Sequence, residues 1–461
     1  MNNVNIIKLS GLALTLTLGC LMTTPAVADD VNFGPQKQVA TFSYFPDGST
    51  RDMVRYVYPV DLDGDRVQEV IFAGFETQPN TPAEYSNAKV KIFGWKRGSF
   101  KDLTSQWLPG KNSRFQGVGD IGFGDFNGDG RIDAFLSAYT DMAHPVNAWL
   151  LINKGNRFKR VRLSKDIWQH GVAVGDINND GKDDVMEAGY DAPVSVYLGN
   201  KRNGLKQVEL SGHHAAKDIF YNNYNGTGSG AAIADFLDEG RPSVIVADSS
   251  NADHPADTRL FRFVLNRKKP VALEPVSTLP KPRLEKRRWK KRGITGSHDV
   301  RVKAFDFNKD KLMDVIVFSR SWQNKSGEWP FVSAVQFLEN RGNGKFRDVT
   351  GERLIDYDHS SNASYNPIFA DFNKDGRTDI FLGEVSYRSK HNSHAFLLQN
   401  GKGQFVDTGR TAFNRHVGSA QAAIGSVVLG PRKKYFFVMD AMLPVTGKHQ
   451  VSIARISFSR N

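Results

Sequence analysis

Residues 123–135 read FGDFNGDGRIDAF, and this short stretch decides how the rest of the chain is organised. An apolar segment leads into a loop that starts at Asp125, and a second apolar segment follows Asp133. Between them, acidic or amide side chains alternate with glycines, which suit a tight turn. The stretch therefore predicts two short strands joined by a compact loop rich in oxygen atoms.

The same pattern recurs along the chain at a spacing of roughly 60 residues. Further copies begin at Asp61, Asp176, Asp306 and Asp371, a weaker copy begins at Asp235, and residues 422–441 keep the strands without the acids. Repeats of this length are typical of solenoids, propellers and other arrays. Their spacing along the chain predicts seven units.

Each unit contains four short segments rich in β-branched and aromatic residues, separated by Gly, Asn and Asp. Seven such antiparallel units predict an all-β fold, a seven-bladed β-propeller that forms a single domain over residues 29–461. The last unit stops at its third strand, and residues 37–45 form a spare strand near the N-terminus. We expect this strand to complete the last blade, because closure removes open sheet edges. A loose N-terminal arm is the alternative.

The acidic loops predict calcium sites. Oxygen ligands at positions 1, 3, 5 and 9 of a wrapped loop converge on one centre, and a hard cation such as Ca²⁺ prefers oxygen. Position 12, where an EF-hand carries its bidentate Glu, is apolar in four of the five loops, so these are not EF-hands. We expect three to five structural calcium sites. Their ligands would be Asp61, Asp63, Asp65 and Glu69 in loop one; Asp125, Asn127, Asp129 and Asp133 in loop two; Asp176, Asn178, Asp180 and Asp184 in loop three; Asp306, Asn308, Asp310 and Asp314 in loop five; and Asp371, Asn373, Asp375 and Asp379 in loop six.

The loops differ at position 6, which a sharp turn reserves for glycine. Loops two, three and six have Gly there, whereas Arg66 and Lys311 occupy it in loops one and five. We expect these two loops to bind calcium more weakly. Loop four has Leu237 and Ser243 at two ligand positions and is expected to be empty.

The units resemble the FG-GAP or VCBS-type repeats of integrin α-subunit propellers and of many secreted bacterial proteins. The resemblance rests on residues 123–135 and on the turn over residues 400–405, NGKGQF, and it covers nearly the whole chain after the N-terminal segment. It implies seven blades, with calcium in the first hairpin loop of several of them. It does not imply one activity, because such propellers occur in adhesion modules, lectins and polysaccharide-processing enzymes.

Residues 1–28 look like a secretory signal peptide. Lys8 precedes an apolar stretch over residues 9–22, and a cleavage site follows at Ala28. Acylation at Cys20, which would make a lipoprotein, is the alternative. Cys20 is the only cysteine of the chain, so no intramolecular disulfide is possible. No later segment is apolar and long enough to span a membrane, and we expect a secreted or periplasmic monomer.

The connections between units, and those between second and third strands, should lie on the face opposite the calcium loops. All eleven histidines fall in these connections, and rigid blades commonly present binding groups on such loops. The candidate ligand-binding residues are Tyr139, Asp141, His170, Tyr190, Asp191, His298, Arg320, Trp322, Tyr387, Arg388 and His416. The alternative is that polar residues simply accumulate in long connections.

Three of these histidines, His170, His298 and His416, precede first strands and are expected to ring the mouth of the central channel. Such a ring could bind a transition metal or become protonated in mild acid. Ordinary hydrogen bonding between neighbouring loops is the alternative.

The formal net charge is +12, and residues 281–293 form a strongly basic stretch that contains Trp289. These features favour binding of a glycan or another anionic polymer through the face opposite the calcium loops. Export argues against nucleic acid as the partner. Two alternatives are an adaptor between envelope proteins and a polysaccharide lyase with a Tyr or His base. Since G-x-S-x-G, HExxH, Walker A and dinucleotide motifs are absent, no catalytic residue is assigned and an enzyme is less favoured.

Overall fold

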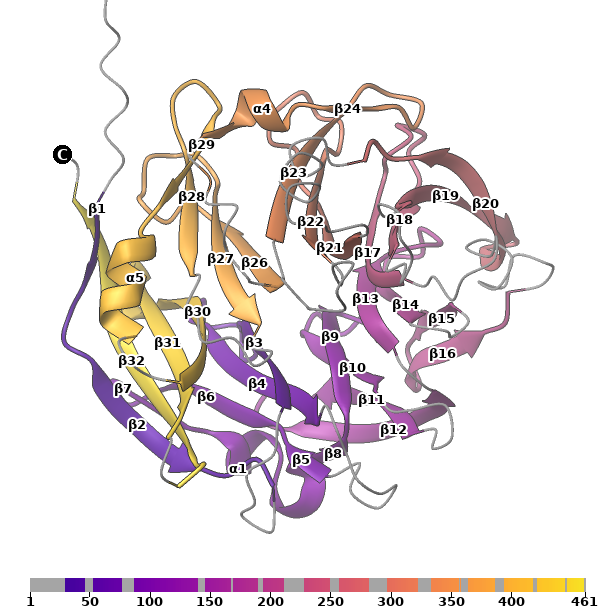
Figure 1. The fold of residues 1–461 in the computed structure, drawn as a ribbon. Helices are drawn as coiled ribbons and strands as arrows, with labels where there is room; N and C mark the ends of the chain where they lie inside the picture. The colour runs from indigo at the N-terminus through magenta and orange to yellow at the C-terminus, as the bar shows by residue number, and fades with distance from the viewer. Residues whose placement is uncertain are drawn as a thin grey trace, which may run out of the picture.

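A computed structural model of the chain shows seven four-stranded antiparallel blades arranged in a ring (Figure 1), so the predicted fold is confirmed. The structure describes residues 30–45, 53–76, 87–139, 146–166, 169–189, 194–210, 228–248, 257–281, 297–321, 333–355, 357, 364–385, 394–417, 421–443 and 446–459.

The first four blades follow the chain in order. Blade one contains β3 (Met53–Val60), β4 (Glu69–Glu76), β6 (Lys91–Lys96) and β7 (Ser99–Asp102). Blade two contains β9 (Val118–Gly124), β10 (Asp133–Ala138), β11 (Val146–Asn153) and β12 (Phe158–Asp166). Blade three contains β13 (Gln169–Gly175), β14 (Asp184–Gly189), β15 (Ser195–Asn200) and β16 (Gly204–Val208). Blade four contains β17 (Gly228–Ala234), β18 (Ser243–Asp248), β19 (Arg259–Asn266) and β20 (Lys269–Thr278).

The remaining blades complete the ring. Blade five contains β21 (Ser297–Ala304), β22 (Val315–Ser321), β23 (Ser333–Asn340) and β24 (Phe346–Asp348). Blade six contains β26 (Ser364–Ala370), β27 (Asp379–Val385), β28 (Ala395–Gln399) and β29 (Phe405–Thr408), with β25 (Leu354–Ile355) parallel to β29. Blade seven contains β30 (Gln421–Gly430), β31 (Lys434–Met442) and β32 (His449–Ser459).

Two N-terminal strands close the ring. Strand β2 (Lys37–Phe42) pairs with the first half of β32, and β1 (Asp30–Phe33) pairs with its second half. The closing strand predicted near residues 37–45 is therefore confirmed, and a second strand begins earlier at Asp30. Both ends of the chain thus contribute to blade seven, and the outer edge of β32 is covered.

Short elements decorate the outside of the blades. Strands β5 (Asn87–Lys89) and β8 (Arg114–Gln116) pair beside blade one, with helix α1 (Thr104–Trp107) and the 3₁₀ turn η2 (Gly110–Ser113) between them in the chain. Helices α4 (Thr350–Arg353) and α5 (Arg410–Val417) follow β24 and β29, and the 3₁₀ turn η3 (Pro431–Lys433) joins β30 to β31. None of the helices in the described ranges has the length and apolarity needed to cross a membrane.

The hydrophobic core lies between neighbouring blades. One cluster joins blade two to blade three, where the Phe135 and Tyr197 rings lie 5.2 Å apart. The residue after the leading Asp of each acidic loop is buried in these layers, as Phe126 and Phe236 are at 0% exposure. Each acidic loop is thereby anchored to the core through its second residue.

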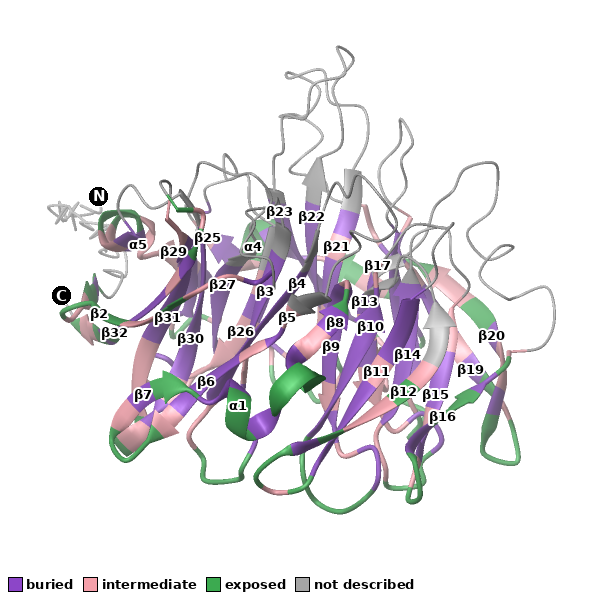
Figure 2. Cartoon of the chain, turned by 90° about the horizontal axis from the view of Figure 1, so that it is seen from below, coloured by how far each residue is buried: buried purple, intermediate pink, exposed green. Residues whose placement is uncertain are grey.

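The first strand of each blade is innermost and lines the central channel (Figure 1). Turns between strands one and two, and between strands three and four, lie at one end of the blades, because the strands run antiparallel. Figure 2 shows exposed turns on that side of the ring. We call it the calcium-loop face, and the other side the opposite face.

Candidate calcium loops and the opposite face

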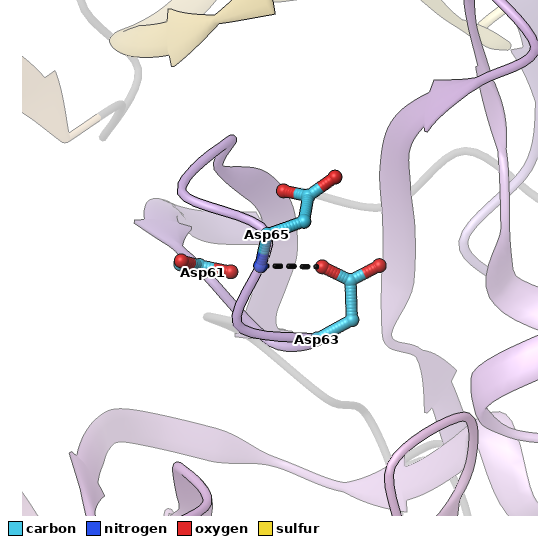
Figure 3. A group of neighbouring side chains, drawn as sticks. All are labelled: Asp61, Asp63 and Asp65. Atoms are coloured by element: carbon cyan, nitrogen blue, oxygen red, sulfur yellow. Dashed lines mark hydrogen bonds between the residues drawn. The ribbon is translucent and has the colours of Figure 1, made fainter.

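Loop one brings three carboxylates together. Ligand atoms of Asp61, Asp63 and Asp65 all lie within 4.8 Å of one another. The Asp61 carboxylate accepts hydrogen bonds from the backbone N–H groups of Gly64 and Arg66, each at 2.8 Å. Figure 3 shows the Asp63 carboxylate turned toward the backbone nitrogen of Asp65, at 3.3 Å. The backbone of the loop therefore holds the oxygen atoms in fixed positions.

The other acidic loops wrap in the same way. In every case the leading Asp accepts a hydrogen bond from the backbone N–H at position 6. These bonds join Gly130 to Asp125, Gly181 to Asp176, Gly240 to Asp235, Lys311 to Asp306 and Gly376 to Asp371. The loops therefore share one backbone hydrogen-bond pattern, while calcium binding stays a prediction.

The position-9 carboxylates are buried and tie the loop to the third strand. Asp314 accepts one hydrogen bond from the Phe307 N–H at 3.1 Å and one from the Asn340 N–H at 2.8 Å. Burial raises the pKa of Asp314 to about 7, and the two backbone hydrogen bonds oppose that rise. Asp133, Asp184 and Asp379 behave alike, with pKa values raised to about 7 by burial, and the pKa of Glu69 rises to about 8. A nearby cation would relieve this electrostatic cost.

Cationic side chains partner the position-5 carboxylate in three loops. Lys182 contacts Asp180 at 2.6 Å, and Arg131 contacts Asp129 at 3.3 Å. Arg377 pairs with Asp375 in the same way. These three cations occupy position 7 of their loops, where loop one has Val67. Among the described residues, no basic side chain forms an ion pair with the aspartates of loop one. The weaker calcium binding expected of loops one and five stays a prediction.

Position 6 does adopt the left-handed conformation that sharp turns require. Its φ is 80° at Gly130 and 85° at Gly376, and it is 68° at Arg66 and 76° at Lys311. A side chain at such φ values costs roughly 1–2 kcal/mol. The strain expected in loops one and five is therefore present.

Loop four lacks the ligands. The Leu237 side chain is buried in the core, and the Ser243 hydroxyl replaces the position-9 carboxylate by accepting the Phe236 N–H at 3.2 Å. The loop keeps its shape without offering a comparable set of oxygen atoms.

Amide side chains at the ends of third strands join neighbouring blades, a role that sequence reasoning missed. The Asn340 amide donates to the carbonyls of Phe236 and Met313, each at 3.0 Å. Asn153 reaches Leu62 at 2.6 Å, and Gln399 reaches Phe307 at 3.2 Å. Each amide binds the carbonyl at position 2 of the preceding blade's loop. The recurring Asn or Gln that ends the third strand was the available signal.

The structure places few of the candidate ligand-binding residues. Asp141, Tyr190, Asp191, Trp322, Tyr387 and Arg388 lie outside the described residues. The backbones of His170, His298 and Arg320 lie in β13, β21 and β22, where His298 pairs with Arg320, and nothing is described of their side chains. Tyr139 follows β10 and packs against the core of blades one and two. The ligand-binding role of this set stays a prediction.

The axial position expected for His416 is wrong. This residue lies in α5, which packs against β1 at the outer edge of blade seven, and its ring stacks on Phe33 with 4.2 Å between centroids. The helix forms there because Phe413 and Val417, four residues apart, both bury their side chains. His416 cannot share a ring around the channel with residues of the innermost strands β13 and β21.

An ion pair crosses the central channel. The Arg301 guanidinium on β21 of blade five lies 3.4 Å from the Asp120 carboxylate on β9 of blade two. The Tyr58 hydroxyl of blade one donates to Asp120 at 2.6 Å. Burial lowers the pKa of Lys303, whose charge is favoured by Asp120. Side chains from blades one, two and five therefore meet inside the channel.

Two further polar clusters fix seams between blades. At the seam of blades seven and one, Asp440 accepts from Arg55 at 2.6 Å and from the Tyr44 hydroxyl at 3.0 Å. At the seam of blades four and five, Asp299 accepts from the Ser319 hydroxyl at 2.6 Å and from Thr258. Burial raises the pKa of Asp299 to about 6. Both clusters use the end of a second strand and the start of a third strand, next to the opposite face.

The FG-GAP-like repeat family matches residues 61–136, 125–187 and 306–382, which begin with the leading aspartates of loops one, two and five. The chain carries FG-GAP-like repeats. The resemblance inferred from the loop sequences is thereby confirmed. The matched ranges also include loops three and six.

A curated relative of the repeat region is cartilage acidic protein 1 of Xenopus tropicalis, 24% identical over 200 residues. The match covers 40% of this chain and 29% of the relative, so the chain spans under a third of that protein's length. Among solved structures, a Dos1 propeller is 10% identical, with 90% of this chain and 95% of that chain covered and a TM-score of 0.42. An exo-1,5-α-L-arabinanase from a bovine ruminal metagenomic library is 7% identical, with 65% and 98% covered and a TM-score of 0.30. Such distant likenesses carry no argument about function.

Proposed function

We propose that this propeller is an exported, calcium-stabilised scaffold that binds a glycan or another anionic polymer through the opposite face. The observation that carries the proposal is the unequal build of the two faces. The described turns on the calcium-loop face are short and hydrogen-bonded, whereas the strand ends at the opposite face are separated by longer stretches of sequence, such as those between β16 and β17, β20 and β21, and β22 and β23. Long connections on a rigid ring are the usual place for binding groups.

Calcium fits the donor set of the loops. The aspartates of loop one supply oxygen ligands within 4.8 Å of one another, and backbone N–H groups orient them. Asp61, Asp63, Asp65 and Glu69 would hold the ion there, and the equivalent residues would do so in loops two, three, five and six. Bound calcium would neutralise crowded carboxylates and stiffen the hairpin that each loop closes.

Charge supports an anionic ligand. The chain has a net charge of +12, and residues 281–293 form a strongly basic stretch of its sequence. The buried clusters around Asp440 and Asp299 hold the blade ends rigid beneath the opposite face. A positively charged chain with a rigid scaffold suits acidic sugars, whose carboxylates and sulfates accept charge-assisted hydrogen bonds.

The test is a polysaccharide and glycan array, probed with residues 29–461 in calcium at low and moderate salt. We expect binding to one class of acidic sugar that survives moderate salt. The variant Trp322→Ala/Arg388→Ala should weaken this binding. The matched variant Lys154→Ala/Arg157→Ala, on the calcium-loop face, should leave it unchanged. Binding to every anion that disappears with salt would contradict the proposal.

A further inference from the structure

The turns between third and fourth strands form an outer rim on the calcium-loop face. They comprise residues 97–98, 154–157, 201–203, 267–268, 341–345 and 400–404 in blades one to six. Figure 2 shows exposed turns along this side of the ring. We call them the rim turns.

The rim turns carry one sign of charge. None contains Asp or Glu, and all contain Lys or Arg. The cations in or beside them are all exposed: Lys96, Arg97, Lys154, Arg157, Lys201, Arg202, Arg267, Lys268, Lys269, Arg341, Lys345 and Lys402. The six rim turns therefore form a positive outer ring on the calcium-loop face, while the acidic loops of that face lie between the first and second strands, nearer the channel.

Most of this charge faces solvent. Within the described residues, Arg341 contacts the Glu339 carboxylate at 2.7 Å, and Lys96 donates to the Gln106 amide at 2.7 Å. The remaining rim cations pair with no carboxylate of the described chain. Their field is therefore available to a partner.

In two tight turns, Lys and Arg adopt positive φ values, a backbone conformation that favours Gly and Asn. Arg267 and Lys268 have φ of 47° and 65°, and Arg432 and Lys433, in the first hairpin turn of blade seven, have φ of 59° and 53°. Such turns usually carry Asn-Gly, because positive φ is costly for other side chains. These strained turns lie in blades four and seven, both on the calcium-loop face.

Apolar side chains are exposed beside the rim. Ile132 and Met313, in loops two and five, are 36% and 37% exposed. Both follow position 7 of an acidic loop and so lie on the calcium-loop face. They add apolar area to a surface that is otherwise charged and polar.

We propose that the calcium-loop face docks on a membrane surface with anionic headgroups. Cations distributed around a ring match a plane of negative charge, and each Lys or Arg near such a surface strengthens binding. Ile132 and Met313 would contact the interface between headgroups and acyl chains. The rim turns contain no aromatic residue on which bases could stack, so a nucleic acid strand is less well matched. This docking uses a different face from the proposed polymer site and does not depend on it.

The experiment is cosedimentation of residues 29–461 with vesicles in calcium buffer at about 0.1 M salt. Phosphatidylcholine vesicles containing one quarter phosphatidylglycerol are compared with phosphatidylcholine alone. We expect binding to the anionic vesicles only. Each rim cation removed should cost about fivefold in affinity, so Lys154→Ala/Arg157→Ala/Lys201→Ala/Arg202→Ala should abolish measurable binding.

The matched control removes the same charge from the outer wall: Lys37→Ala/Lys101→Ala/Arg162→Ala/Arg415→Ala. This control variant should still bind the anionic vesicles. A separate variant, Ile132→Ser/Met313→Ser, should lose the vesicle binding that persists at raised salt concentration. Equal loss in both fourfold variants would mean that net charge alone acts, and would overturn the proposal. Equal binding to neutral vesicles, or to soluble polyphosphate at the same phosphate concentration, would overturn it as well. The rim variants should leave the glycan array unchanged, so the two proposals fail separately.

Discussion

Single amide side chains hold this ring together at its seams. Asn340 is 1% exposed, and its amide donates to two backbone carbonyls, one of them in the preceding blade. Asn340→Ala leaves both carbonyls without a partner in a buried seam. We expect a loss of about 2–3 kcal/mol in the free energy of unfolding, measured by urea denaturation. Asn112→Ala, at an exposed position, is the control and should change little. Equal effects of the two substitutions would contradict the seam role.

The buried pair of Asp440 and Arg55 should be intolerant of losing one partner. His449 and Arg55, through charge and hydrogen bonds, lower the pKa of Asp440 to about 2 against the opposing effect of burial. Arg55→Ala would leave a buried carboxylate without its guanidinium, and we expect a loss of roughly 3–5 kcal/mol at pH 7. Below pH 2 both proteins carry a protonated Asp440, so the difference should shrink. A difference that stays constant between pH 7 and 2 would refute this account.

The buried His394 side chain should make the stability of the propeller depend on pH. Both ring nitrogens are buried without hydrogen-bond partners among the described residues, and the ring packs with Phe381, Phe413 and Phe437. Burial, with a smaller effect of Arg410, lowers the pKa of His394 to about 3. The unfolded chain binds the proton near pH 6.5, so stability is full above that pH and falls as pH drops toward 3.

His394→Phe should remove this dependence. Between pH 7 and 5 the variant should lose about 2 kcal/mol less stability than the wild type. Thermal or urea unfolding at several pH values measures the difference. Parallel stability curves for the two proteins would show that His394 does not titrate between these states.

At the scale of the element, the acidic hairpin loop is the unit that repeats. Lys311 has φ of 76° at position 6, where loops two, three and six have glycine. Lys311→Gly should stabilise the protein by about 1 kcal/mol and tighten calcium binding in loop five. The reciprocal change Gly376→Lys should weaken loop six. Isothermal titration with calcium tests both, and an unchanged or weaker loop five in Lys311→Gly would speak against the strain argument.

The elements were largely predictable because acidic loops mark the first hairpin of blades one to six. The turn chemistry around Asp125 fixes two strands, and its repetition fixes the blade count. Helix α5 was not predicted, since it is only eight residues long and its Phe413 and Val417 resemble strand residues in isolation. Its presence moved His416 from the expected channel mouth to the outer edge of blade seven. Periodicity over so short a segment does not separate a helix from a strand.

At the scale of the whole molecule, closure of the propeller was predictable from the sequence, whereas contacts across its channel were not. The closing strand was predictable from the missing fourth strand of the last unit, although β1 was not. The contact between Arg301 and Asp120 joins residues of blades five and two, and no local pattern marks two charges that meet across a channel. For the amide contacts between blades, the recurring Asn or Gln was visible in the sequence, but its partner depends on the geometry of the neighbouring unit.

Calcium bound in the acidic loops is expected to stabilise the whole propeller. Thermal unfolding of residues 29–461 with calcium and with a chelator tests it most directly. We expect the chelator to lower Tm by several degrees, because the crowded carboxylates then repel one another. Asp61→Ala/Asp65→Ala and Asp129→Ala should each lower Tm partly in calcium and make little difference in the chelator. A Tm that does not change on chelation would mean that the loops act only as turns, and it would contradict a stabilising role for calcium.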